Sequence, residues 1–144
     1  MYIKKLLFEK YGPVDHLDIT PQFDENEKPK PIVFIGKNGS GKTLLLGNLL
    51  DGLIELKRQK YSSLVEVEDN KYLKVGKKDY IKNSEDYSHI NIRFENDQQF
   101  ATYTDLMSNL NHADFITKHG VRNFEGQNDN KFKDAYFNRF PNTW

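Results

Sequence analysis

The sequence predicts an α/β fold in which a parallel core strand, a glycine-rich loop and a helix follow one another beside an antiparallel sheet. Three observations predict this arrangement. Residues 31–35, Pro-Ile-Val-Phe-Ile, form a β-branched and aromatic run typical of a buried central strand. Residues 36–43 match the phosphate-binding loop pattern Gly-x-x-x-x-Gly-Lys-[Ser/Thr]. Residues 44–56 predict a helix, because leucines recur there at steps of three and four, at Leu46, Leu49, Leu53 and Leu56.

The octapeptide of residues 36–43 carries the clearest chemical signal in the chain. Glycine lets a backbone pass close to a polyphosphate and point several N–H groups at it. Lys42 adds charge for the β- and γ-phosphates and for the phosphoryl group in transfer, and the Thr43 hydroxyl is suited to ligate Mg²⁺. The helix that follows directs its free N–H groups at the same place. The predicted nucleotide-binding residues here are Gly36, Lys37, Asn38, Gly39, Ser40, Gly41, Lys42, Thr43 and Leu44.

Composition limits the class of protein. The 144 residues suffice for one modest domain with a real core. Lys plus Arg and Asp plus Glu number 21 each, so the zero net charge gives no general attraction to nucleic acid or membrane. Cysteine is absent, which excludes disulfides and cysteine metal sites. We expect a soluble, cytoplasmic protein with no signal peptide, no membrane span and no membrane partner.

The remaining segments predict mainly antiparallel structure. Residues 2–9 and 14–20 have the pattern of two strands joined by a hairpin through Tyr11, Gly12 and Pro13. Strand-like pieces follow the helix at 63–67, 72–75, 79–81, 88–94 and 98–103, and the last two flank a tight turn. Helical pieces are predicted at 105–110 and 130–140. We therefore divide the chain into a nucleotide-binding lobe, 1–105, and an aromatic-rich helical extension, 106–144.

The first fifty residues resemble the start of an ABC-type ATPase. Asn38, Gly39 and Ser40 within the loop, and the strand corner at Tyr11 before it, are similar to the group that serves chromosome maintenance, DNA-break repair, recombination and anti-phage defence. Residues 89–94 resemble the antiparallel strands of that group. The resemblance implies binding of ATP and Mg²⁺, with Tyr11 near the adenine. A plain packing role suits Tyr11 equally well.

The same resemblance implies an incomplete ATPase head. In this group an Asp-Glu pair after an apolar strand holds Mg²⁺ and polarises water, and a Ser-Gly-Gly segment comes from a second subunit. The sequence contains neither. The 144 residues are then expected to bind Mg-ATP and to hydrolyse it only when completed by a further lobe and a partner subunit. Implied partners are a second head across the nucleotide, in a homodimer or larger assembly, a nuclease or other effector, and DNA.

Three weaker readings stay open. Gln127 is a candidate for the Mg²⁺-sensing glutamine of the group, although a solvated loop glutamine is the alternative. A nucleotide-binding module without catalysis fits the loop and the missing acid. A small nucleotide kinase also fits the loop, but such enzymes need arginines over the phosphates, and here the arginines are scattered at Arg58, Arg93, Arg122 and Arg139.

Overall fold

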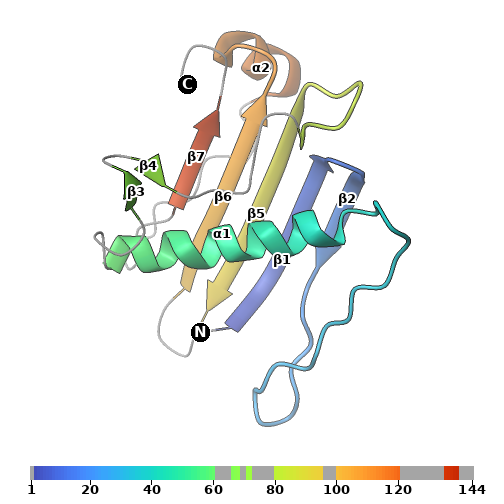
Figure 1. The fold of residues 1–144 in the computed structure, drawn as a ribbon, viewed down its shortest axis with the longest axis vertical. Helices are drawn as coiled ribbons and strands as arrows, with labels where there is room; N and C mark the ends of the chain where they lie inside the picture. Colours follow the sequence, from blue (N-terminus) through green and yellow to red (C-terminus); the bar gives the residue numbers. More distant parts are fainter. Residues whose placement is uncertain are drawn as a thin grey trace.

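A largely antiparallel sheet, crossed on one face by a long helix, organises the described part of the chain (Figure 1). The computed structural model describes residues 2–60, 66–68, 71–72, 80–95, 100–120 and 135–139. The main sheet has the strand order β2-β1-β5-β6-β7, antiparallel except that β7 runs parallel to β6. Its strands are β1 (Tyr2–Tyr11), β2 (Val14–Ile19), β5 (Tyr87–Glu95), β6 (Phe100–Ser108) and β7 (Ala135–Arg139). The other elements are α1 (Lys42–Lys60), α2 (His112–His119) and a ribbon of β3 (Glu66–Glu68) with β4 (Lys71–Tyr72).

The hydrophobic core lies between α1 and the central strands. Alternate residues of β1 and β5 point to the same face, so Leu6 lies opposite Ile92 and Phe8 opposite Ile90, all four buried. Burial of side chains of this size contributes about 1.5–3 kcal/mol each. The cluster is completed by buried Tyr11, Leu45, Ile81, Phe94, Tyr103 and Met107.

Helix α1 lies across the strands with an unusual face toward them (Figure 1). Its buried side includes the polar residues Asn48, Asp51 and Glu55. Leu46 and Leu53, from the leucine pattern in the sequence, are instead 56% and 46% exposed. Among the described residues, neither helix has the length and apolar character needed to cross a membrane.

The predicted parallel core is wrong. Residues 31–35 run outside every sheet, within the connection from β2 to α1, and no backbone hydrogen bond of theirs occurs among the described residues. Val33 is 75% exposed and Ile35 is 92% exposed. A β-branched run favours an extended backbone, but a strand forms only where a neighbour supplies the other half of the ladder. The described chain is therefore mostly β, with two helices, and not an α/β fold built on a parallel core.

Local signals predicted other elements correctly. The hairpin through residues 12–13 is confirmed by the pairing of β1 with β2, and the pair of strands around the turn after residue 94 is confirmed by β5 and β6. The helix after the glycine-rich loop is also confirmed. The predicted strand pieces 63–67 and 72–75 lie partly outside the described residues and touch β3 and β4 only at their ends, while Ile81 forms an isolated bridge to Tyr11.

The predicted helices near the C-terminal end are wrong where the structure describes them. Residues 105–108 belong to β6, and residues 135–139 form β7. Residues 103–108 are all buried, so the alternation that marks a half-buried strand is absent from the sequence there. The helix comes later, where the Asn111 side chain accepts a hydrogen bond from the Asp114 N–H at 2.9 Å and caps α2. Strand β6 runs through residue 105, the predicted domain boundary, and β7 lies in the same sheet.

Gly52 lies on the buried side of α1, close to aromatic rings of the sheet. A Cβ at this position would lie 3.3 Å from Phe94 Cζ and 3.4 Å from Tyr103 Cγ. We predict that Gly52→Leu lowers the free energy of unfolding by about 1–3 kcal/mol, because the larger side chain overpacks the interface. Urea denaturation measures the change. Leu50→Ala, on the exposed side of the same helix, is the control and should cost less than about 1 kcal/mol; equal losses would contradict this packing.

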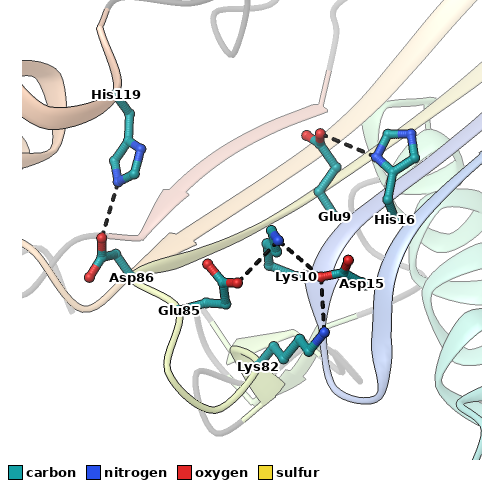
Figure 2. A network of polar contacts seen from close by, with 8 residues as sticks. All are labelled: Glu9, Lys10, Asp15, His16, Lys82, Glu85, Asp86 and His119. Carbon is teal, nitrogen blue, oxygen red and sulfur yellow. Dashed lines mark hydrogen bonds and ion pairs between the residues drawn. The ribbon is translucent and has the colours of Figure 1, made fainter.

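Glu9 links three neighbouring strands through two histidines. Its carboxylate lies 3.0 Å from His89 Nδ1 on β5 and 3.5 Å from His16 Nδ1 on β2. The hydrogen bond with His89 lowers the pKa of Glu9 below its ordinary value of 4.5, and the charges of both histidines add to this. Figure 2 shows the pair with His16.

The lowered pKa of Glu9 predicts a specific loss of stability in acid. Its contribution is present above the ordinary pKa of 4.5 and disappears as the pH falls through the lower pKa of the folded state. Because Glu9 is partly exposed, we expect no more than about 1 kcal/mol. Glu9→Gln should therefore flatten the fall in unfolding free energy below pH 4.5 in urea titrations. An unchanged pH profile would show that the carboxylate does not contribute.

Candidate functional site

Residues 36–41 form an irregular loop that leads directly into α1. Gly39 and Gly41 have φ angles of +81° and +92°, which side chains rarely adopt. The Ser40 N–H donates to the Lys37 carbonyl at 3.2 Å and closes a turn within the loop. A Cβ at Gly36 would lie only 2.6 Å from Ser40 Oγ. Conformation therefore favours glycine at positions 39 and 41, whereas a side chain at Gly36 would require Ser40 to move.

The Lys42 side chain folds back over the loop. Its Nζ donates to the carbonyl of Gly36 at 2.7 Å and to that of Lys37 at 2.9 Å, and lies 3.4 Å from Ser40 Oγ. An ammonium group has three donors and no acceptor, so these oxygens hold it at the loop. Lys42 also begins α1, where the helix dipole adds positive potential. The arrangement concentrates positive charge beside the glycines.

A hollow of about 250 Å³ opens at this junction. It is smaller than the ~300–1,000 Å³ of typical ligand pockets, and therefore suits the phosphate part of a ligand better than a whole nucleotide. The structure brings most of the predicted residues together in it, and adds a proline from the turn between β1 and β2. The lining residues are Pro13, Asn38, Gly39, Ser40, Gly41, Lys42, Thr43 and Leu44.

Gly36, Lys37 and Tyr11 were also predicted to bind the nucleotide, and they are not among the residues that line the hollow. Tyr11 is fully buried, with its ring 5.6 Å from that of Tyr80 and 6.4 Å from that of Phe8. Burial raises the pKa of Tyr11 to about 12. Of the two roles considered for it, packing is the one that its position in the core fits. Gln127 lies outside the described residues.

The turn between β1 and β2 forms a second wall of the site, which the sequence analysis did not assign. A Cβ on Gly41 would lie 3.0 Å from both Pro13 Cγ and Val14 Cγ2. A Cβ on Gly12 would lie 2.8 Å from Leu44 Cδ1. The turn and the loop are thus in direct contact. The glycine and proline that predicted the hairpin were the available signal, but they did not indicate what the hairpin would touch.

The donors in the hollow set limits on its chemistry. Among the described residues, its lining includes a lysine, a threonine and a serine but no carboxylate. Within the described ranges, no group of three or more His, Cys, Asp or Glu residues could hold a metal ion. Thr43, which was predicted to ligate Mg²⁺, is exposed in the first turn of α1 and lines the hollow. A catalytic acid would have to come from elsewhere.

Comparison with known proteins finds no family model that matches the chain and no curated protein that matches it. The interpretation of this site therefore depends on its own geometry and chemistry.

Gly39 and Gly41 allow a matched test of the loop. Both have positive φ angles, so alanine at either should cost about 1–2 kcal/mol of backbone strain. Only at Gly41 would the new Cβ also press on Pro13 and Val14, since nothing lies within 4 Å of a Cβ at Gly39. We predict that Gly41→Ala lowers the unfolding free energy by at least about 1 kcal/mol more than Gly39→Ala in urea denaturation. The reverse order would contradict the contact between loop and turn.

Proposed function

We propose that this chain binds Mg-ATP at residues 36–43, as the nucleotide-binding part of a cytoplasmic ATPase of the ABC type. The observation that carries the proposal is the positively charged, glycine-lined hollow at the start of α1. Backbone N–H groups, a helix N-terminus and a lysine that converge on one small hollow are the combination that polyphosphates require. DNA repair or phage defence is the setting that the resemblance of the loop and strand corner favours.

Each group has a separate role in this proposal. The N–H groups of the loop and of the first turn of α1 bind the phosphate oxygens. Lys42 exchanges its contact with the Gly36 carbonyl for the β- and γ-phosphates, where its charge also stabilises the phosphoryl group in transfer. Thr43 ligates Mg²⁺. Asn38 and Leu44 bound the hollow and shape it around the phosphates.

Hydrolysis in this proposal needs groups from outside the hollow, because no carboxylate lines it. A further lobe and a partner subunit would supply them, in a homodimer or larger assembly with the nucleotide between two heads. Apolar surface exposed at Val33, Ile35, Leu46 and Leu53 supports association of this kind. It borders a groove of about 500 Å³ lined by Tyr2, Ile3, Leu6, Pro21, Pro29, Lys30, Ile32, Phe34, Leu46, Leu49, Leu53 and Phe94. A nuclease or other effector, and DNA, are proposed partners of the assembly.

A nucleotide-binding module without catalysis is the second candidate, and the absence of a carboxylate from the hollow favours it. Phosphate release by the isolated chain separates the two, since rapid turnover would require an acid that the hollow does not contain. A nucleotide kinase has less support. Arg93 pairs with Glu95 at 3.4 Å, lies over the Phe100 ring, and does not line the hollow.

Lys42 provides the direct test of nucleotide binding. We predict that Lys42→Met weakens Mg-ATP binding at least about tenfold in isothermal titration calorimetry, because a charge-assisted contact to phosphate is lost. Lys28→Ala is the matched control, since Lys28 is exposed and lies outside both residues 36–43 and the lining of the hollow. Its affinity should stay within about twofold of the wild type. No binding by the wild-type chain, or equal binding by Lys42→Met, would refute the proposed function.

A further inference from the structure

The turn between β1 and β2 is held from the side opposite the loop by residues 80–82. The Gly12 N–H donates to the Tyr80 carbonyl at 2.5 Å, and the Lys82 N–H donates to the Lys10 carbonyl at 2.9 Å. Tyr11 and Ile81 form an antiparallel bridge between these bonds. The turn thus contacts this segment, the loop at Gly41 and the first turn of α1 at Leu44.

Four charged side chains join the turn to the same segment (Figure 2). Asp15 Oδ1 lies 2.9 Å from Lys10 Nζ and 2.9 Å from Lys82 Nζ. Lys10 Nζ also lies 3.1 Å from Glu85 Oε1. Asp15, on β2, therefore connects β2 to β1 through Lys10 and to residues 80–82 through Lys82. Two lysines and two carboxylates balance in charge, so the group is not itself suited to bind an anion.

The backbone of the turn needs this support. Lys10 and Gly12 both have φ angles of +54°. A lysine rarely adopts that conformation, and it persists only where surrounding contacts fix it. Hydrogen bonds from Lys82 and then Lys10 lower the pKa of Asp15 to about 2, so the carboxylate stays charged at neutral pH.

We propose that Asp15 is a positioning residue for the phosphate site. Through Lys10 and Lys82 it holds the β1–β2 turn against Gly41 and Leu44, and so sets the shape of the hollow. Asp15 does not line the hollow and need not touch the nucleotide. The inference rests on the proposed function where it concerns affinity, but the effect on the loop itself does not depend on a ligand.

The direction in which Asp15→Asn changes the nucleotide affinity separates a positioning role from a direct effect of charge. Asp15→Asn removes a negative charge near a site for an anion, so a direct charge effect would strengthen nucleotide binding. Positioning predicts the opposite, because the turn loses its link to Lys10 and Lys82. Asp15→Glu keeps the carboxylate and should restore most of the affinity. Asp18→Asn is the control, since it breaks the 3.2 Å pair with Lys5 on the same two strands away from the turn.

Binding of a fluorescent Mg-ATP analogue to the full chain gives the first measurement. We expect Asp15→Asn to bind about three- to fivefold more weakly at low salt, and Asp15→Glu and Asp18→Asn to stay within about twofold of the wild type. The deficit of Asp15→Asn should shrink at about 1 M NaCl, because salt screens the exposed ion pairs of the wild type. Tighter or unchanged binding by Asp15→Asn would overturn the proposal.

Amide hydrogen exchange by NMR, without nucleotide, gives the second measurement. The Leu45 N–H donates to the Gly41 carbonyl at 2.9 Å and reports on the junction of loop and helix. We expect faster exchange at Leu45 and Gly12 in Asp15→Asn but not in Asp18→Asn. Unchanged exchange at Leu45 in Asp15→Asn overturns the positioning role, whatever the affinity. If the wild type binds no nucleotide, the proposed function fails, and the exchange rates alone decide whether Asp15 positions the loop.

Discussion

The contact between Gly41 and the β1–β2 turn is the constraint on which the site depends. A side chain at position 41 would press on Pro13 and Val14, whose side chains already fill that space. Gly41 immediately precedes α1, so the turn meets the loop where the helix begins. Lys42, the next residue, folds back over the loop from that point. The part of the sheet that contacts the site is thus the hairpin of β1 and β2 at its edge.

Helix α1 packs closely against the sheet and also buries polar side chains on that side. At Gly52 it approaches the aromatic rings of β5 and β6 closely enough to exclude a Cβ without adjustment. On the same side it buries Asn48, Asp51 and Glu55, and the Asn48 amide donates to the Leu44 carbonyl at 2.8 Å within the helix. Burial of these polar groups turns several leucines outward. The leucine repeat therefore predicts that the helix has an apolar side, but it does not show which side of the helix packs on the sheet.

Features encoded by short stretches of sequence could be predicted, and features that join distant stretches could not. The glycines of the loop, the helix after it and the hairpin at Gly12 and Pro13 each depend on a few adjacent residues. By contrast, residues 31–35 have strand composition but no partner in the described chain, and composition cannot supply one. The inward position of Tyr11 depends on its place at the end of β1, where it pairs with Val14 and bridges to the distant Ile81. The pair of Asp15 with Lys82 joins residues 67 positions apart, which no local pattern indicates.

The exposed segment 31–35 also has a consequence for the colloidal behaviour of the chain. After Pro31, its residues lie outside every sheet, include β-branched side chains and carry no charge, which are properties that favour intermolecular β pairing. The formal net charge is zero and the isoelectric point is about 6.9, so near neutral pH little overall repulsion keeps copies apart. Lys28 and Lys30 before the segment and Lys37 after it are then the nearby charges that oppose self-association, in the manner of gatekeeper residues around an apolar strand.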